Sequence, residues 1–251
     1  MKKLVAFAAL ALFAAPPVLA AETPDFIAAA IAASQRSEKD RERDAKDKPA
    51  ELLTFAGIHP GMAVADIFGG GGYWTELMAR SVGKDGRVTL VNNSPYVEFA
   101  KDDLKTRFVE GRLINARPRT VESCDLKLGK SAYDLVLIFM SYHDLYYVDE
   151  AGGWPAIDAA QFLGQLHAAL KPGGILLIVD HAAAAGTGKT KAGDLHRIEE
   201  SFAQADIEGH GFRLEKTWDG YRHSDDDKSK QVFDPAVRGK TDRFTHLYRK
   251  R

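Results

Sequence analysis

Four consecutive glycines, at positions 69–72, follow an apolar segment and constrain the fold of this chain more than any other feature. Residues 63–68 have the length and apolar character of a buried strand, and residues 73–79 have a helical pattern. Four glycines weaken a plain strand-to-helix connection, yet they let the backbone turn tightly and approach a ligand closely. The free N–H groups at a helix start favour a carboxylate or phosphate. The sequence therefore predicts a ligand-binding loop here.

Apolar strand patterns alternate with amphipathic helical patterns along the rest of the chain. We expect strands at 87–91, 113–124, 133–140, 175–179, 212–218 and 243–248, and helices at 95–105 and 157–170. A further helix is expected to begin at Asp194 and to carry Leu195, Ile198, Phe202 and Ala205. Such alternation predicts a single α/β domain whose parallel sheet is covered by helices on both faces.

The N-terminal segment 1–21 has the pattern of a secretory signal peptide. Lys2 and Lys3 precede an apolar run at 4–15, two prolines follow, and small residues come next, so cleavage is expected after Ala20 or Ala21. The run is shorter than the about 20 residues that a membrane span needs, which disfavours an uncleaved anchor. The sequence therefore predicts an exported, periplasmic protein without a stable membrane anchor after cleavage.

Residues 22–60 are expected to form an N-terminal helical extension of the domain at 61–251. Residues 25–34 suit a short helix or a linker, and the charge run at 37–49 predicts a helix with a solvated face. Pro49 suits the first turn of another short helix, which Gly57 can end. Cys124 is the single cysteine, so no internal disulfide can form, and we expect it to fill a small apolar space.

The charge balance places further limits on partners. With 34 Lys and Arg against 35 Asp and Glu, the formal net charge is −1. Proteins that bind nucleic acid or anionic membranes usually have a marked basic excess, so neither partner is expected.

The glycine loop distinguishes between two classes of cofactor. The dinucleotide fingerprint G-x-G-x-x-G fits only if position 74 is its third glycine, and that residue is Trp74, which disfavours NAD. By contrast, Asp66, Gly70 and Gly72 in VADIFGGGGYW resemble the first motif of class I S-adenosylmethionine-dependent methyltransferases. In that motif an acid and alternating glycines enclose the amino-acid end of the cofactor. Phe68 stands where the motif usually has another glycine.

The resemblance continues along the chain. GRVTLVNNSP, YDLVLIFMSYHDLYY and LKPGGILLIVDH resemble the second, fourth and fifth strands of this superfamily, and the terminal strand pair resembles its antiparallel hairpin. DKPAELLTFAGIHPGM and FDPAVRGKTDRF are similar to a bacterial family called predicted methyltransferases, of which many members are exported. The resemblance implies a Rossmann-like fold, in which a seven-stranded, mostly parallel sheet has the order 3-2-1-4-5-7-6 and strand 7 is antiparallel.

The resemblance also implies S-adenosylmethionine as cofactor and a set of residues that bind it. These residues are Asp66, Phe68, Gly69, Gly70, Gly71, Gly72, Tyr73 and Asn92. Asn92 stands at the strand end where the superfamily has an acid for the ribose hydroxyls. An amide accepts a weaker hydrogen bond than a carboxylate, so aspartate at this position is expected to maintain or improve cofactor affinity.

The loop after the strand at 133–140 is the candidate for chemistry. In the superfamily's strand order, ligands lie where the order reverses, so this loop should face the glycine loop. His143, beside Asp144, is expected to act as a general base. Tyr142 and Tyr146 would line an aromatic acceptor pocket; alternatively, His143 bonds backbone groups and the tyrosines only pack.

Two further side chains could contact the acceptor, and a metal is not expected. His181 could orient the substrate, and Arg197 could hold a carboxylate. His143, Asp144, Asp180 and His181 lack the helical spacing of metalloprotease ligands and have no cysteine partner, so the sequence predicts no zinc.

Three functions remain open at this point. The first is a methyltransferase acting on a small molecule or an envelope component. The second is an exported protein that binds S-adenosylmethionine or a nucleoside without turnover. The third, an NAD-dependent oxidoreductase, is disfavoured by Trp74 and by the terminal hairpin.

Overall fold

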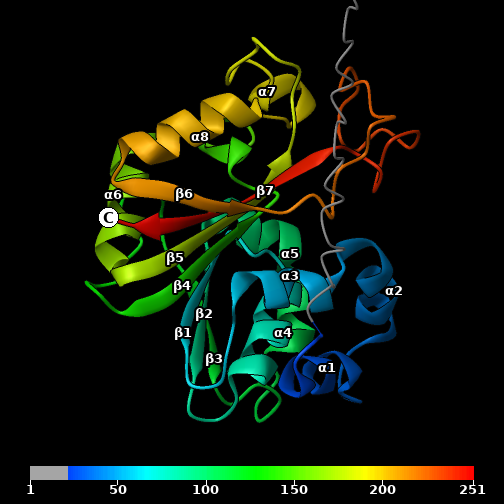
Figure 1. Cartoon of the computed structure of the whole chain (residues 1–251), viewed down its shortest axis with the longest axis vertical. Coiled ribbons are helices and arrows are strands. Elements are labelled where there is room, and N and C mark those ends of the chain that lie inside the picture. The colour runs from blue at the N-terminus through cyan, green and yellow to red at the C-terminus, as the bar shows by residue number, and fades with distance from the viewer. Residues whose placement is uncertain (1–21) are drawn as a thin grey trace, which may run out of the picture.

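The computed structural model describes residues 22–251, so the expected signal peptide lies outside the described residues. Seven strands form one twisted sheet with helices on both sides (Figure 1). The strands are β1 (Ala63–Ile67), β2 (Arg87–Asn92), β3 (Ala116–Thr120), β4 (Tyr133–Phe139), β5 (Leu170–His181), β6 (Phe212–Thr217) and β7 (Arg243–Lys250). The helices are α1 (Asp25–Ala32), α2 (Glu38–Asp47), α3 (Pro49–Ala56), α4 (Tyr73–Val82), α5 (Ser94–Arg107), α6 (Ala159–Ala169), α7 (Ala192–Leu195) and α8 (Glu200–Gly209), with a 3₁₀ turn η1 (His143–Tyr146).

The strand order is β3-β2-β1-β4-β5-β7-β6, as predicted. β1 pairs in parallel with β2 on one side and with β4 on the other, whereas β7 is antiparallel to both β5 and β6. The chain order therefore reverses at β1 and β4. The loops that follow these two strands leave the sheet at the carboxyl ends of its parallel strands, which we call the ligand edge, and a ligand can bind between them.

The sheet separates two apolar layers of core. Successive side chains of a strand point to opposite faces, and every residue of β1 is buried. Ile67 packs in the layer with Phe162 of α6, whereas Val64 packs in the layer with Leu77 of α4 and Leu52 of α3. Burial on both faces explains why β1 is apolar apart from Asp66.

Two expected elements differ from the structure. β3 is confined to Ala116–Thr120 and mostly exposed, because it is the edge strand of the sheet. The helix expected from Asp194 is divided into α7 and α8. His196 has a left-handed φ of 52°, which ends α7, and the Ile198 N–H then donates to the His181 carbonyl at 3.0 Å. Pairing with the end of β5 therefore interrupts the helix.

The N-terminal helices form as predicted, and α2 has the expected solvated face, on which Glu38, Lys39, Glu42 and Lys46 are exposed. Its other face contacts the domain. Asp40 and Asp47 are buried, and the Arg107 guanidinium lies 2.8 Å from Asp40. Tyr73 donates a hydrogen bond to Asp44 at 2.6 Å. The charges of this inner face therefore hold α2 near the ligand edge of the sheet, at the right of Figure 1. Cys124 is exposed and does not fill an apolar space.

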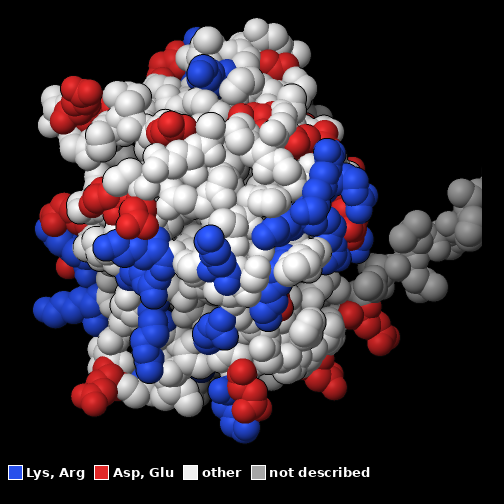
Figure 2. All heavy atoms as spheres, turned by 90° about the vertical axis from the view of Figure 1, so that its left-hand side faces the viewer, with Lys and Arg blue, Asp and Glu red and all other residues white. Residues whose placement is uncertain are grey.

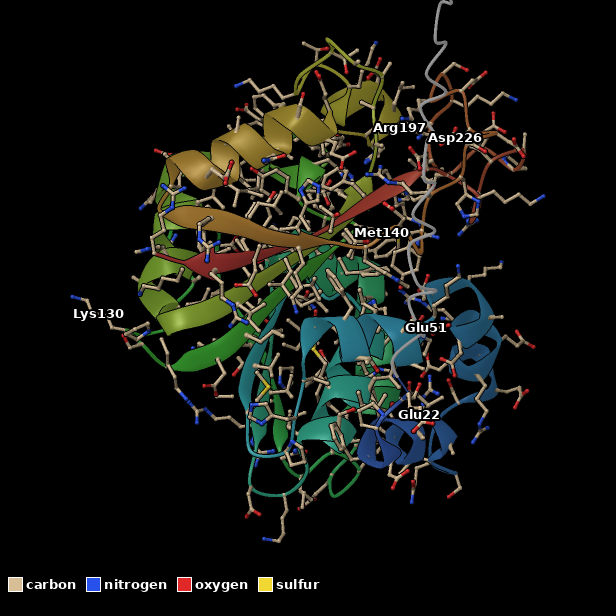
Figure 3. All side chains as sticks on the ribbon, in the orientation of Figure 1. Glu22, Glu51, Lys130, Met140, Arg197 and Asp226 are labelled. Carbon is tan, nitrogen blue, oxygen red and sulfur yellow. The ribbon has the colours of Figure 1, made fainter. Side chains whose placement is uncertain are left out.

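The surface turned away from α2 has an uneven distribution of charge. Figure 2 shows the face on which the C-terminus lies, where Lys and Arg side chains gather across the middle. Lys130 projects from this side of the molecule (Figure 3). Within residues 22–251, none of the helices combines the length and the apolar character that a membrane span requires.

Candidate functional site

The glycine loop leaves the carboxyl end of β1 and enters α4. Phe68 and Gly70 have φ values of 53° and 55°, so the backbone is left-handed on both sides of Gly69. Phe68 holds this conformation at the position where the motif usually has glycine, and its ring stacks on Tyr96 with centroids 4.9 Å apart. A Cβ on Gly70 would meet no atom within 4 Å. The loop therefore faces open space at Gly70, as a ligand-binding loop requires.

A cavity of about 430 Å³ opens in front of this loop. The glycine loop forms one wall, Phe99 and Asp103 of α5 form another, and Lys39 and Arg43 of α2 contribute a third. Lys39 and Asp103 form an exposed ion pair of 2.9 Å between α2 and α5. The N-terminal extension therefore helps to enclose the cavity, a role that its charged sequence does not reveal.

Asp66 ends β1 beneath the loop and is fully buried. The Thr75 hydroxyl donates to its Oδ2 at 2.5 Å, whereas Oδ1 has no hydrogen-bond partner. Burial raises the pKa of Asp66 to about 6, although the bond from Thr75 opposes the shift. A buried, unpartnered acceptor oxygen beside a ligand loop is suited to an ammonium group or a bridging water.

Asn92 lies at the end of β2 and supports the glycine loop. Its Nδ2 donates to the Gly70 carbonyl at 2.9 Å, and its Oδ1 accepts from the Gly70 N–H at 3.1 Å. Asn92 is buried and each of its polar atoms already bonds Gly70, so it supports the loop, and only its second N–H and the second lone pair of Oδ1 remain for a ribose hydroxyl. Tyr73 has a related supporting role, since its hydroxyl contacts Asp44 and the Arg43 guanidinium lies 4.1 Å from its ring centroid.

A second, larger cavity of about 720 Å³ shares Arg43 and Phe99 with the first. Its wall includes apolar side chains from the end of β4 and from the loop between β6 and β7, among them Met140 and Phe233. Figure 3 shows Met140 at the ligand edge of the sheet. Because the two cavities have walls in common, molecules bound in them would be neighbours.

Cationic side chains predominate in the second cavity. Arg43, Lys46, Arg238 and Arg243 line it, against one carboxylate, Asp47. Asp47 lies 2.5 Å from Arg43 and 3.5 Å from Arg243, so it is shared between two guanidinium groups. The Nε of Arg243 is buried and has no hydrogen-bond partner. The cavity is therefore apolar with an excess of positive charge.

His143 is buried at the start of η1 between two carboxylates. Its Nδ1 lies 2.8 Å from Asp180, and its Nε2 lies 3.2 Å from Asp144. Although burial opposes the shift, these carboxylates hold the pKa of His143 well above its usual value. Both ring nitrogens therefore face carboxylates that favour the protonated imidazole, which argues against the expected role as a general base.

Of the other residues predicted to contact the acceptor, His181 lines the second cavity and the two tyrosines do not. His181 lines the second cavity and bonds Thr241 through Nδ1 at 2.8 Å. Tyr142 and Tyr146 both donate to the Asp206 carboxylate of α8 and line neither cavity, so they connect η1 to α8 and do not form the expected acceptor pocket in this structure.

Arg197 does not hold a substrate carboxylate. Its side chain is fully buried, and it pairs with Asp226 at 2.8 Å and also donates to two backbone carbonyls. Figure 3 shows Arg197 and Asp226 side by side near the start of β7. This pair fixes the loop between β6 and β7 to the segment that follows α7.

Comparison with known proteins agrees with this fold. Residues 65–178 match the family model described as a methyltransferase domain. The chain is 30% identical over 129 residues to the ubiquinone/menaquinone biosynthesis C-methyltransferase UbiE of Hydrogenovibrio crunogenus, covering 51% of this chain and 45% of that protein. The UbiE protein of Shewanella pealeana is 25% identical over 193 residues, covering 73% and 69%. The chain spans about half the length of most of the curated relatives it matches.

Solved structures show the same fold at low sequence identity. An S-adenosylmethionine-dependent methyltransferase from Aquifex aeolicus has a TM-score of 0.58 at 17% identity, covering 85% of this chain and 97% of that one. An arsenic(III) S-adenosylmethionine methyltransferase from Chlamydomonas reinhardtii has a TM-score of 0.54 at 20% identity, covering 92% and 74%. The [4+2]-cyclase SpnF scores 0.55 at 16% identity, covering 87% and 84%, so this fold alone does not define the reaction.

The fold is that of class I methyltransferases. Residues 65–178, which are less than half of the chain, match the methyltransferase domain model, and S-adenosylmethionine is the methyl donor that this match implies. The residues fit this cofactor: Gly70 leaves a cradle that a Cβ would fill, and Asp66 offers an unpartnered acceptor to an ammonium group.

Proposed function

We propose that this protein transfers the methyl group of S-adenosylmethionine, bound in the 430 Å³ cavity, to a small anionic acceptor in the 720 Å³ cavity. The observation that carries the proposal is the shared wall of the two cavities, formed by Arg43 and Phe99. Methyl transfer is an in-line displacement, so donor and acceptor must meet across such a boundary.

The chemistry requires little of the protein beyond alignment. When bound, S-adenosylmethionine supplies a methyl group on a positively charged sulfur. The acceptor's lone pair forms the new bond to the methyl carbon, and the S–C bond breaks with its electrons on sulfur. An acceptor atom that carries hydrogen, such as a hydroxyl or an amine, also loses a proton, whereas a phenolate or carboxylate oxygen loses none. The apolar wall excludes water, and the cationic side chains hold the acceptor's negative charge.

His181 is the candidate to receive that proton. It lines the acceptor cavity, and its Nδ1 is occupied by Thr241. Burial, together with the positive charges of His143 and Arg243, holds the pKa of His181 well below its usual value. A neutral imidazole can accept a proton, whereas the proton-carrying His143 cannot.

The acceptor is proposed to carry a carboxylate, phosphate or phenolate on an apolar body. Four cations against one carboxylate favour an anion, and the buried Arg243 Nε has a free donor. A carbon acceptor in ubiquinone or menaquinone biosynthesis is a second candidate, because the curated relatives are named for that activity.

A methyl-acceptor screen with labelled S-adenosylmethionine tests this function. Apolar carboxylates, phosphates and phenols are compared with neutral analogues of the same shape. Arg238→Gln removes one exposed cation of the cavity and should raise KM for an anionic acceptor severalfold while S-adenosylhomocysteine affinity stays unchanged. Lys130→Gln removes an exposed cation on a distant face and is the matched control. Preferential methylation of the neutral analogues would contradict the proposed acceptor class.

A further inference from the structure

We propose that His143, Asp144 and His196 form a binding site for one divalent transition-metal ion. Their ligand atoms all lie within 4.8 Å of one another. Asp144 Oδ1 lies 3.2 Å from His143 Nε2 and 4.0 Å from His196 Nδ1. In a tetrahedral zinc site with bonds of about 2.0–2.1 Å, neighbouring ligand atoms are about 3.3 Å apart. A small rotation of the His196 side chain would therefore complete the geometry.

In His143 and Asp144, the polar atoms that point away from the proposed ion already have hydrogen-bond partners. His143 Nδ1 lies 2.8 Å from Asp180 Oδ1, which leaves Nε2 directed to the shared space. The Tyr96 hydroxyl donates to Asp144 Oδ2, which leaves Oδ1 for the same space. Carboxylates and hydroxyls that orient metal ligands in this way are usual around zinc and iron sites. The site thus has both inner ligands and the groups that position them.

The ring of the third ligand packs against an aromatic side chain. His196 stacks on Tyr147, with centroids 5.0 Å apart and an interplanar angle of 28°. It belongs to the segment after α7, whereas His143 and Asp144 belong to η1. A metal ion bound here would join the loop after β4 to the segment after β5. The site adjoins the acceptor cavity, because the ring of Phe233, which lines that cavity, lies 5.1 Å from the His196 ring.

Charge favours a cation at this place. Asp144 and Asp180 bring two carboxylates to one imidazole, and their side chains are 9% and 0% exposed. The nearby buried guanidiniums of Arg197 and Arg243 are paired with other carboxylates, Asp226 and Asp47. A proton on His143 leaves one uncompensated negative charge, whereas a divalent ion with neutral His143 balances both. The 3.2 Å separation of His143 Nε2 and Asp144 Oδ1 is also long for a charge-assisted hydrogen bond.

The sequence predicts no zinc because its candidate ligands lack a metalloprotease spacing. The third ligand comes from His196, far along the chain from His143, and only the fold brings the two rings to 5.5 Å. Imidazole and carboxylate ligands suit Zn²⁺, Fe²⁺, Co²⁺ and Ni²⁺. This inference does not depend on the proposed methyl transfer.

Calorimetric titration of Zn²⁺ tests the site on untagged, full-length protein previously treated with a chelator. We expect one Zn²⁺ per chain. His196→Ala should weaken the affinity at least tenfold, and it should still fold because His196 is partly exposed. Asp180→Asn, which alters a positioning residue, should weaken it about 10- to 100-fold. His59→Ala, at an exposed histidine, is the control and should leave the affinity unchanged.

Two further readouts separate this site from adventitious binding. Zn²⁺ should raise the Tm of the wild-type protein and of His59→Ala but not of His196→Ala. Co²⁺ should give visible absorption that disappears in His196→Ala. Absence of stoichiometric binding, or equal affinity in the wild type and in His196→Ala, would overturn the proposal.

Discussion

The Asn92 amide forms two hydrogen bonds with the backbone of Gly70, donating to its carbonyl at 2.9 Å and accepting from its N–H at 3.1 Å. A side chain that resembles a cofactor ligand in the sequence is thus part of the support of the glycine loop. The second lone pair of Oδ1 is still available to a ribose hydroxyl, but it belongs to a buried side chain whose position is set by the two bonds to Gly70.

Asn92→Asp should therefore weaken cofactor binding, contrary to what the sequence resemblance predicts. A carboxylate still accepts from the Gly70 N–H, but it cannot donate to the Gly70 carbonyl, which is left without its partner. We expect this loss to cost about 1–3 kcal/mol in the free energy of unfolding and in the free energy of S-adenosylhomocysteine binding. Urea unfolding measures the first and titration with S-adenosylhomocysteine measures the second. Asn93→Asp is the matched control, because Asn93 only accepts from the Tyr96 N–H at the start of α5 and aspartate caps equally well. Unchanged affinity and stability in Asn92→Asp would show that the hydrogen bond from Asn92 to the Gly70 carbonyl is not needed.

Asp66 should make stability and cofactor affinity depend on pH. Its pKa is about 6 in the folded protein, above the usual 3.8, so its neutral form stabilises the fold below pH 3.8 and that contribution is lost as the pH rises through 6. Relative to Asp66→Asn, the wild type should lose up to about 3 kcal/mol of stability between pH 4 and pH 8. Urea unfolding at several pH values measures this difference.

Cofactor affinity should change with pH in the opposite direction. If the unpartnered Oδ1 binds the cofactor's ammonium group, ionisation of Asp66 strengthens the contact, and affinity rises from pH 5 to pH 7. Asp66→Asn should lack this rise. The same pH profile in both proteins would remove Asp66 from the cofactor site.

Arg107→Lys should loosen α2 from the domain. Arg107 bonds Asp40 of α2 at 2.8 and 3.1 Å and donates through Nε to the Gly71 carbonyl at 2.5 Å. Lysine keeps the charge but cannot reach these partners together. We expect the free energy of unfolding, measured with urea, to fall by at least about 2 kcal/mol, the scale of one charged hydrogen bond. Arg117→Lys, on the exposed edge strand, should change stability by less than about 0.5 kcal/mol; an equal effect of both variants would contradict the anchoring role.

Export remains a proposal that rests on the pattern of Lys2, Lys3 and the apolar run after them. N-terminal sequencing of protein from the periplasmic fraction should begin at Ala21 or Glu22. Cytosolic protein that retains Met1 would contradict it.

The fold could be predicted because its central strands are buried on both faces. β1 and β4 are apolar apart from one aspartate each, so their positions are visible without knowledge of their partners. The α2 helix could not be placed in this way, because a helix of charged residues has no apolar stripe. Its partners are far along the chain: Arg107 is 67 residues from Asp40, and Tyr221 is 174 residues from Asp47.

Less of the site could be predicted, because residues far apart in the sequence form much of it. The glycine loop is a contiguous motif, and its left-handed Phe68 shows that the motif's geometry is kept where its residue type is not. Arg238 and Arg243 lie in or next to a loop without periodicity, and no local signal marks them as cavity residues. His143 was identified by position alone, but its two carboxylate neighbours decide its protonation, and Asp180 comes from another strand.

Calorimetric titration of S-adenosylhomocysteine into the wild type and Gly70→Val tests the central claim, that the 430 Å³ cavity holds the cofactor. Gly129→Val is the matched control, since Gly129 also has a positive φ and open space but lies in an exposed turn away from the cavity. The wild type and Gly129→Val should bind S-adenosylhomocysteine and not NAD, and Gly70→Val should lose at least about 2 kcal/mol of binding free energy, the scale of steric and backbone strain. Equal affinity in a folded Gly70→Val, or preferential binding of NAD by the wild type, would contradict the account.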